Sequence, residues 1–335
     1  MDADEVGIVV IGRNEGDRLV RCLNSIHGFA ARVYVDSGST DGSQELARSL
    51  GFHVLDLDST QEFTAARARN LGIFFIADNY PQVSLIQTVD GDCELTPGWT
   101  EQAQRRLASD PALAVVFGRR RERFPDRNLY HRACDAEWNV PVGPAASSGG
   151  DALFRLSALK EVGGFNPDLI SWEEPDLCFR LRRADWRIYS DGQDMTVHDV
   201  DISSLRQWWR RALRAGLGIA ALASLHGLSA DKGWRRFLLR GFFWAALLVS
   251  ALIALVLGLL LQSPVLLVAG LLILAVMALQ VVRTAIRSRS KFRSFGAALQ
   301  WSSLLLASKV AEAQGACVYW FRRLTSSRMA IVEYK

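Results

Sequence analysis

Between Gly241 and Val282 the chain runs for 42 residues without a single charged side chain. A membrane-spanning helix needs about 20 such residues, so this run is long enough for two. Gln262-Ser263-Pro264 lies near its middle and supplies a turn. Cations stand outside both ends: Arg235, Arg236 and Arg240 before the run, and Arg283, Arg287, Arg289, Lys291 and Arg293 after it. The pattern predicts a helical hairpin with both ends cytoplasmic. A buried helical pair is disfavoured, because the rest of the chain is too small to cover it.

Charge divides the chain near the same place. Residues 1–200 hold 21 Lys and Arg against 31 Asp and Glu, whereas residues 201–335 hold 18 against 4. An acidic front and a basic, apolar back favour a soluble domain fastened to an anionic membrane surface. The five cysteines show no paired spacing, which fits a reducing compartment and argues against disulfides or a zinc site. The acidic first residues do not resemble a signal peptide, so we expect a cytoplasmic front half.

The segments on either side of the hairpin are helical in pattern. Residues 203–225 carry Trp208-Trp209-Arg210-Arg211, which predicts an interfacial helix with its indoles at headgroup depth. Residues 295–321 are apolar but contain Lys309 and Glu312. A third span there would place Arg322, Arg323 and Arg328 outside the cell, so we favour an amphipathic helix on the cytoplasmic face.

The first 200 residues alternate short apolar strands with helical stretches. The expected strands are 7–11, 32–36, 54–57 and 84–89, and the expected helices include 17–26 and 43–50. The β-branched content of the first strand is typical of a buried parallel strand. This alternation predicts an α/β sheet that binds ligands at its strand ends.

Two acidic motifs follow predicted strands. The first begins at Asp36, and the second is Asp90-Gly91-Asp92. Two carboxylates separated by one glycine can turn oxygens toward one hard cation whose other positions are left for phosphates. Such a triplet also occurs in solvated turns, but its place after a buried strand favours a functional role.

These motifs belong to an ordered set that resembles glycosyltransferase family 2, in particular the membrane-anchored bacterial type that builds exopolysaccharides and lipid-linked glycans. The set comprises Ile8–Glu15, Asp36–Ser43, Ala68–Gly72, Asp90–Asp92, Gly149–Asp151, Val162–Phe165 and Trp172–Leu181. The resemblance covers about the first 215 residues. It implies the GT-A fold of nucleotide-diphospho-sugar transferases, followed here by interfacial helices and a transmembrane helical hairpin.

The resemblance also implies a donor site. Its expected residues are Gly12, Arg13, Asn14, Glu15, Asp36, Arg67, Arg69, Asp90, Gly91, Asp92, Gly149 and Gly150. Asp36 would hold the nucleoside, and guanidinium groups would pair with phosphate. Ser37 stands where many members have a second Asp, which leaves the nucleobase open. Asp90, Asp92 and His198 would hold Mn²⁺ or Mg²⁺ against the diphosphate.

Glu173-Glu174-Pro175-Asp176 matches the family segment whose second acid is the general base. Glu174 fills that position, and Glu173 is the second candidate. The opposing interpretation is that these acids cap a helix beginning near Asp176, because acids favour helix N-termini.

A dense basic segment, Arg119-Arg120-Arg121, follows another apolar strand. Such runs are usually solvated. In an otherwise acidic domain they also suit an acceptor phosphate or lipid headgroups, as do Trp208, Trp209, Arg210 and Arg211.

We therefore predict four parts: a catalytic domain over 1–202, amphipathic interfacial helices over 203–236, the transmembrane hairpin over 237–283, and a basic loop with an amphipathic helix over 284–335. The expected function is inverting sugar transfer from a nucleotide-diphosphate sugar to a lipid-linked hydroxyl, at the cytoplasmic face of a bacterial inner membrane rich in anionic lipids. No nucleic-acid partner is expected. The alternatives are a polyprenyl-phosphate glycosyltransferase and a non-catalytic nucleotide-sugar-binding scaffold. A dinucleotide-binding oxidoreductase is disfavoured, because no GxGxxG follows the first strand.

Overall fold

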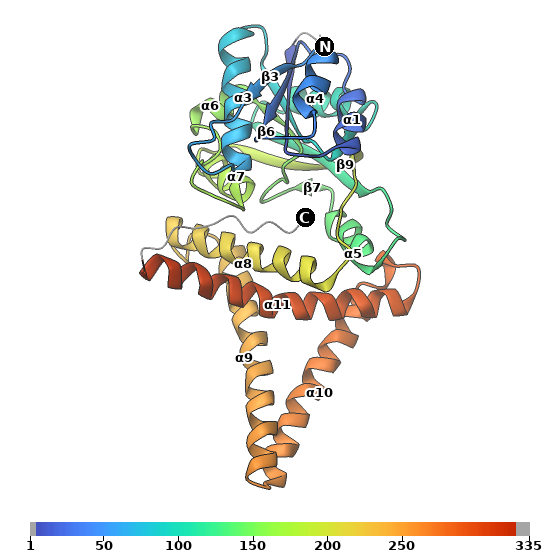
Figure 1. Cartoon of the computed structure of the whole chain (residues 1–335), viewed down its shortest axis with the longest axis vertical. Helices are drawn as coiled ribbons and strands as arrows, with labels where there is room; N and C mark the ends of the chain where they lie inside the picture. The colour runs from blue at the N-terminus through green and yellow to red at the C-terminus, as the bar shows by residue number, and fades with distance from the viewer. Residues whose placement is uncertain (1–4, 326–335) are drawn as a thin grey trace. The chain divides into compact units, whose positions relative to one another are not determined.

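The computed structural model describes residues 5–325 and divides the chain into two compact units. The α/β unit comprises residues 1–125 and 137–200, and the helical unit comprises residues 126–136 and 201–335 (Figure 1). Residues 126–136 cluster with the helical unit although they lie between two segments of the α/β unit in sequence.

A mixed sheet forms the centre of the α/β unit, in the order β3-β2-β1-β4-β8-β6-β9-β5, with β7 paired to β9. Its strands are β1 Val6–Gly12, β2 Ala31–Asp36, β3 His53–Asp56, β4 Leu85–Asp90, β5 Cys93–Leu95, β6 Leu113–Glu122, β7 Gly143–Pro144, β8 Ala152–Arg155 and β9 Arg187–His198. The first four strands are parallel, so their carboxyl ends meet at one edge of the sheet. β8 runs antiparallel between β4 and β6. The predicted α/β sheet is confirmed.

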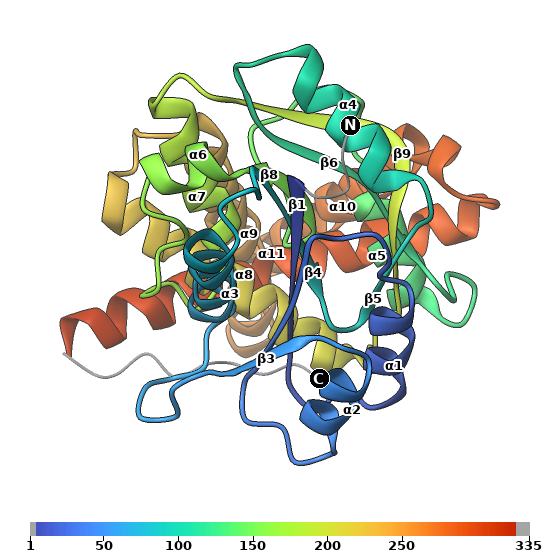
Figure 2. The same cartoon turned by 90° about the horizontal axis from the view of Figure 1, so that it is seen from above.

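Helices pack on both sides of the sheet. They are α1 Asp17–Asn24, α2 Ser43–Ser49, α3 Ala65–Asn79, α4 Trp99–Ser109, α6 Leu156–Glu161 and α7 Glu173–Arg183. α5 Leu129–Trp138 follows β6 in sequence, and most of it belongs to the helical unit. Figure 2 shows α1 and α3 on opposite sides of β1 and β4. α3 lies so close to the sheet that a Cβ on Gly72 would come within 2.4 Å of Val9. This contact fixes the helix that carries Arg69.

α7 starts one turn earlier than predicted. Its first residue is Glu173, preceded by Trp172 in the left-handed region at φ 65°. A non-glycine residue in that region is uncommon and marks a position that the surrounding packing enforces. Asp176 lies within the first turn and pairs with Arg180 at 2.8 Å. All three acids, Glu173, Glu174 and Asp176, therefore lie in the first turn of α7, as the opposing interpretation expected.

The helical unit contains α8 Leu205–His226, α9 Lys232–Leu260, α10 Pro264–Arg287 and α11 Phe295–Leu324, with a short 3₁₀ turn at Arg289–Lys291. α8 and α11 touch backbone to backbone. A Cβ on Gly216 would lie 2.0 Å from the Glu312 carbonyl oxygen, and one on Gly315 would lie 2.1 Å from that of Leu213. Both positions therefore require glycine.

The indoles of α8 lie elsewhere than predicted. Trp208 is buried, and its Nε1 donates to Ser308 Oγ on α11 at 2.9 Å. Trp209 donates to Gln314 Oε1, also at 2.9 Å. A buried indole cannot lie at headgroup depth, so the expected membrane-facing role of Trp208 was wrong. Arg211 stacks on the Trp208 ring, 5.1 Å from its centroid.

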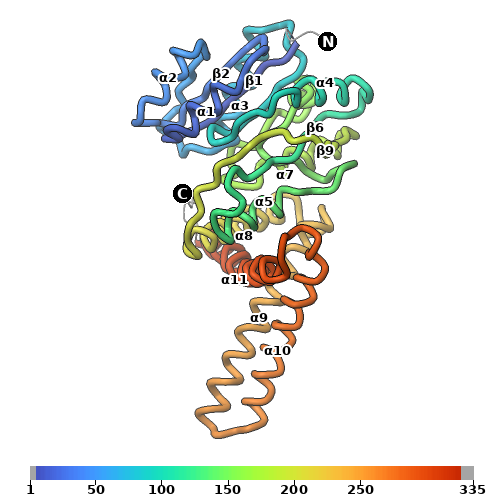
Figure 3. The backbone as a smooth tube through the Cα atoms, turned by 90° about the vertical axis from the view of Figure 1, so that its right-hand side faces the viewer, coloured from blue at the N-terminus to red at the C-terminus, as the bar shows by residue number. Residues whose placement is uncertain are grey.

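α9 and α10 form the predicted hairpin and run side by side (Figure 3). Glycines allow their close approach, since a Cβ on Gly258 would meet Leu267 at 2.9 Å and one on Gly270 would meet Leu255 at 2.7 Å. Leucine and valine side chains cover most of their remaining surface, with Leu260 73% and Val265 75% exposed. Both helices are long and apolar enough to cross a membrane.

Candidate active site

Asp90 ends β4 at the edge where the parallel strands finish, and two arginines hold its carboxylate. Arg69 Nη2 on α3 donates to Oδ1 at 2.8 Å, and Arg120 Nη2 on β6 donates to Oδ2 at 3.1 Å. Both guanidinium groups are largely buried, with 3% and 18% of their side chains exposed. Arg120 was expected to face acceptor or lipid, and its guanidinium group instead pairs with Asp90 and Asp151 inside the domain.

Asp151 completes this arrangement and was assigned no role in the sequence. Its carboxylate accepts from the Asp90 backbone N–H at 2.9 Å, from the Thr196 hydroxyl at 2.7 Å and from Arg120 at 2.8 Å. The preceding Gly150 is required by close packing, since a Cβ there would lie 2.2 Å from Arg69 Nη2. Gly150 thus lies where the resemblance placed it, whereas nothing lies within 4 Å of a Cβ on Gly149.

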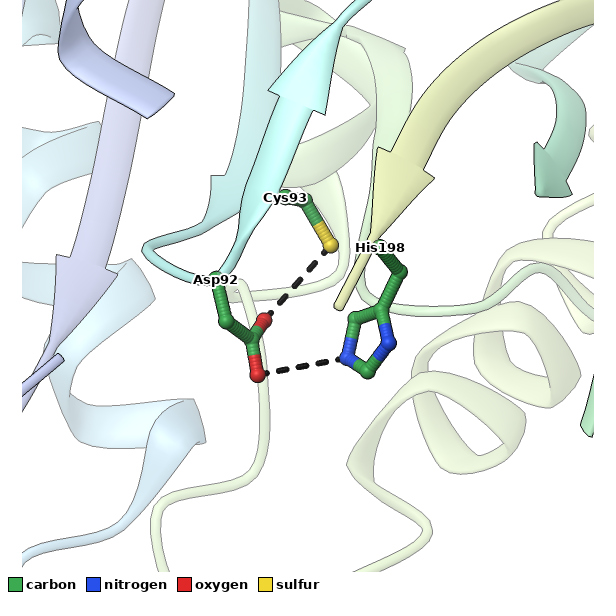
Figure 4. Close-up of side chains that lie close together, drawn as sticks. All are labelled: Asp92, Cys93 and His198. Atoms are coloured by element: carbon green, nitrogen blue, oxygen red, sulfur yellow. Dashed lines mark hydrogen bonds and ion pairs between the residues drawn. The ribbon is translucent and has the colours of Figure 1, made fainter. Parts of the chain in front are cut away.

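Asp92 and His198 face one another across β5 and β9 (Figure 4). Asp92 Oδ2 lies 3.2 Å from His198 Nε2, and both side chains are buried. Burial alone would lower the pKa of His198, but the Asp92 carboxylate outweighs it and raises that pKa. The Cys93 thiol donates to Asp92 Oδ1 at 3.6 Å. Two residues that the sequence predicted as metal ligands are therefore adjacent.

The opposite face of His198 meets two residues that the sequence did not single out. Glu122 Oε2 lies 3.8 Å from His198 Nδ1, and its carboxylate also accepts the backbone N–H groups of Phe124 and Val200 at 3.0 and 3.1 Å. Trp138 packs edge-on against the imidazole, with ring centroids 4.9 Å apart. The imidazole thus lies between the Asp92 and Glu122 carboxylates, with Nε2 turned toward Asp92 and Nδ1 toward Glu122.

The donor set around Asp92 fits a divalent cation. The ligand atoms of Asp92, Cys93 and His198 lie within 4.8 Å of one another. A carboxylate oxygen and an imidazole nitrogen suit Mn²⁺, with the remaining positions open to phosphate oxygens. Burial raises the pKa of the Cys93 thiol well above its ordinary value, and its soft sulfur suits Mn²⁺ less well than a carboxylate oxygen or an imidazole nitrogen does. Asp90 differs from Asp92, because both its oxygens already engage arginine.

Glu173 and Glu174 lie at the start of α7, on the other side of Arg69. Arg69 Nη1 donates to Glu173 Oε1 at 2.9 Å and lies 3.4 Å from Glu174 Oε1. Glu173 is 7% exposed and Glu174 17%. Burial, with the neighbouring Glu173 carboxylate, raises the pKa of Glu174 to about 7, although Arg69 opposes the shift. Glu174 is thus the acid poised to exchange a proton near neutrality.

At the other end of the strand edge, the Asp36 carboxylate already has four hydrogen-bond donors. Its side chain is fully buried and accepts from the N–H groups of Gly38 and Ser39, from Gln44 Nε2 and from the Tyr34 hydroxyl. These hydrogen bonds stabilise the loop after β2, and a nucleoside contact by Asp36 stays a prediction.

The remaining predicted donor residues lie around the ends of β1 and β4. The Gly91 N–H donates to the Ile11 carbonyl at 2.8 Å, which places Gly12 to Glu15 beside the acidic triplet. Asn14, at φ 54°, accepts from the Thr40 N–H through Oδ1 at 2.7 Å. Arg13 stacks on Phe63, 5.4 Å from the ring centroid.

Two other predicted residues of the α/β unit make contacts elsewhere. Arg67 donates to the backbone carbonyls of Glu62 and Asp58 at 2.5 and 3.1 Å, and Arg121 pairs with Asp194 at 3.2 Å. Arg119 lies on β6, two residues before Arg121. Arg210 and Arg211 lie on α8, which belongs to the helical unit.

Comparison with known proteins identifies the family. The family model Glycosyl transferase family 2 matches residues 7–160, and Glycosyl transferase family group 2 matches residues 126–282. The pre-mycofactocin glycosyltransferase of Mycobacterium tuberculosis is 27% identical over 235 residues, which are 66% of this chain and 48% of that protein. The succinoglycan biosynthesis protein ExoA of Rhizobium meliloti is 24% identical over 199 residues, 56% of this chain and 59% of that protein. The chain thus spans about half the length of the curated relatives it matches.

Solved structures agree on the fold. The mannosyltransferase PcManGT from Pyrobaculum calidifontis, in complex with GDP-Man and Mn²⁺, has a TM-score of 0.58 at 17% identity and covers 97% of this chain and 88% of its own. Residues 1–349 of TarS from S. aureus give a TM-score of 0.50 at 15% identity, covering 99% of this chain and 95% of that one. With two overlapping family models that together extend from residue 7 to residue 282, the chain belongs to glycosyltransferase family 2.

Proposed function

We propose that this protein is a metal-dependent, inverting glycosyltransferase that moves a sugar from a nucleotide-diphosphate sugar to a lipid-linked hydroxyl. We further propose that it works at the cytoplasmic face of a bacterial inner membrane, in surface polysaccharide or glycolipid synthesis. The family and the fold support the reaction class. The names of ExoA and of PcManGT with GDP-Man support glycan synthesis and a nucleotide-sugar donor.

One observation carries the proposal: a single guanidinium connects the acidic triplet to the candidate base. Arg69 lies 2.8 Å from Asp90 and 2.9 Å from Glu173, with Glu174 at 3.4 Å. A donor held at Asp90-Gly91-Asp92 would therefore lie beside the acids that receive the acceptor. Such positioning of two reactants is the main requirement of a transfer reaction.

Asp92 and His198 are the residues that would hold the cation, with Glu122 behind the imidazole. When bound, Mn²⁺ or Mg²⁺ neutralises the charge that develops on the leaving nucleoside diphosphate. Asp90 has a different role in this scheme. It orients Arg69 and Arg120, whose guanidinium groups add positive charge beside the diphosphate.

Glu174 acts as the general base in this scheme. Its carboxylate accepts the proton of the acceptor hydroxyl while that oxygen attacks the anomeric carbon from the face opposite the diphosphate. The bond between the anomeric carbon and the diphosphate oxygen breaks, and the electron pair leaves on the nucleoside diphosphate. A pKa of about 7 suits this task, because a base is most effective when its pKa lies near the working pH.

The lipid-linked acceptor is proposed from the helical unit. α9 and α10 are long and apolar enough to hold the protein in a membrane continuously. A water-soluble acceptor would not require such an anchor. A polyprenyl-phosphate glycosyltransferase remains the alternative enzyme, since an ionised phosphate attacks without a base. The raised pKa of Glu174 favours the hydroxyl acceptor over that alternative, and over a non-catalytic scaffold.

A donor screen with product analysis tests the proposal. Purified full-length protein is incubated with Mn²⁺ and a panel of nucleotide sugars, with and without bacterial lipid extract. We expect sugar to enter the lipid phase through an acid-stable glycosidic link. A link cleaved by mild acid would instead identify a sugar–phosphate bond and favour the polyprenyl-phosphate alternative. Absence of transfer from every donor would contradict an enzymatic role.

A further inference from the structure

Four cations lie on one face of α9 where the helix begins. Lys232, Arg235, Arg236 and Arg240 recur at helical spacing, and Leu239 and Phe243 continue the same face. Residues three and four apart are neighbours on a helix surface, so these six side chains are adjacent. Together they line a hollow of about 490 Å³, which we call the α9 hollow.

The positive charge of the α9 hollow is not compensated within residues 5–325. None of its four cations forms an ion pair or a side-chain hydrogen bond with another described residue. Asp231 is the acid adjacent in sequence, but its carboxylate accepts the backbone N–H groups of Gly233 and Trp234 at the helix start. The hollow therefore presents several guanidinium groups, which match phosphate oxygens in geometry and charge.

The other end of the α9 hollow is apolar. Leu239 and Phe243 are 59% and 57% exposed, and the uncharged part of α9 continues beyond them. A free phosphate would use the cations alone and leave these two side chains unpartnered. An amphiphile with an anionic head and a hydrocarbon tail would use both ends.

We propose that the α9 hollow binds the phosphorylated head of one membrane lipid, with the lipid chain lying along Leu239 and Phe243. The inference rests on the proposed membrane insertion of α9 and not on the sugar-transfer reaction. The ligand chemistry is a phosphate ester on a hydrocarbon chain, which both an anionic phospholipid and a polyprenyl phosphate provide.

The chain offers a matched control at the other end of the hairpin. Arg236 and Arg240 are spaced by one helical turn at the start of α9, and Arg283 and Arg287 are spaced identically at the end of α10. Both pairs flank the apolar run on its outer side. A diffuse attraction between cations and anionic lipid would depend equally on both pairs, whereas a bound lipid in the α9 hollow depends on the first pair only.

The experiment counts lipid adducts on the full-length protein by native mass spectrometry in a neutral detergent. The probes are phosphatidylglycerol, a polyprenyl monophosphate and zwitterionic phosphatidylcholine. We expect one adduct of either anionic lipid to be retained in preference to phosphatidylcholine. The Arg236→Gln/Arg240→Gln variant should bind it roughly 25-fold more weakly, at about fivefold for each cation, and the Arg283→Gln/Arg287→Gln variant should match the unmodified chain.

Equal weakening in both double variants, no weakening in either, or equal retention of phosphatidylcholine would overturn the proposal. A parallel loss of both anionic lipids in the first variant would show that the phosphate alone is recognised. A loss confined to the polyprenyl lipid would show that the chain is recognised as well, and both patterns support the hollow. Because adduct counting needs no turnover, failure of the sugar-transfer proposal would leave this comparison interpretable.

Discussion

Arg69 Nη2 lies 2.8 Å from Asp90 Oδ1, and this buried ion pair joins α3 to the strand end that carries the acidic triplet. The same guanidinium donates to Glu173 on α7 at 2.9 Å. Arg69 is 3% exposed, so its charge is compensated by these carboxylates and not by water. Removing it would take this partner from the buried Glu173 carboxylate and leave Asp90 with Arg120 alone, which is costly in a medium of low dielectric constant.

We therefore expect Arg69→Met to destabilise the α/β unit by about 3–5 kcal/mol, the usual loss when one partner of a buried pair is removed. Arg48→Met is the matched control, because the Arg48 side chain is 51% exposed. That control should change the free energy of unfolding by less than about 0.5 kcal/mol. Urea denaturation of the two full-length variants in detergent measures the difference. Equal stabilities would show that Arg69 is not the central counter-ion.

Glu174→Gln should reduce turnover by about 10²–10⁴-fold, because the amide keeps the size of the side chain but cannot accept the proton. The pH profile provides a second readout. Glu174, with a pKa of about 7, must be ionised to act as a base, so activity should rise through that pH and fall about tenfold per unit below it. The residual activity of Glu174→Gln should lack this rise with pH.

Glu173→Gln is the control for this assignment, since Glu173 already accepts from Arg69. It should lose less activity than Glu174→Gln and keep the rise near neutral pH. If only Glu173→Gln abolishes the rise of activity near neutral pH, the general base is Glu173 and not Glu174.

Glu122→Gln should weaken Mn²⁺ binding by roughly 10–100-fold, the usual effect of removing a carboxylate behind a ligating histidine. The reason is that the Glu122 carboxylate lies 3.8 Å from His198 Nδ1, and its negative charge attracts a proton to that nitrogen, which leaves Nε2 for the cation. Electron paramagnetic resonance of free Mn²⁺ measures this without turnover. Glu94→Gln is the control, because Glu94 pairs with Arg21 at 3.0 Å. Unchanged affinity in Glu122→Gln would refute the orienting role.

The hairpin predicts opposite labelling at its tip and at its base. After the five native cysteines are replaced, a cysteine introduced at Ser263 should react with an impermeant thiol reagent added to intact cells. One introduced at Ser288, where α10 ends, should react only after lysis. The reverse pattern would place the α/β unit outside the cytoplasm.

Local sequence was sufficient to predict the helices and strands. It was insufficient to predict which side chains from distant segments contact one another. Strand and helix periodicity predicted β1, β2 and the apolar hairpin, and the triplet at the end of β4 was found because it follows a buried strand. Arg120 was assigned to a basic segment facing acceptor or lipid, since only the pairing of β6 with β8 and β9 brings it to Asp90. Trp208 was assigned to the membrane interface for a similar reason, because its burial depends on α11, 100 residues away.

Glu122 and Trp138 could not be found from local sequence. Glu122 is the last residue of β6 and reaches His198 only through the parallel register of β6 with β9. Asp151 could have been found, because it follows Gly149-Gly150 within a quoted motif and a conspicuous glycine pair often precedes a packed site. Asp36 was assigned to the donor, and local sequence did not indicate that its carboxylate also accepts from the N–H groups of its own loop.

The most direct test of the account is the dependence of nucleotide binding on the cation and on Asp92. Isothermal titration of the full-length protein with GDP and with UDP is carried out in Mn²⁺ and again in excess chelator. We expect at least one nucleotide to bind in Mn²⁺ and its binding to be lost in chelator. Asp92→Asn should lose nucleotide binding even in Mn²⁺, because Asp92 faces His198 at 3.2 Å in the proposed cation site. Undiminished binding in chelator, or in Asp92→Asn, would contradict it.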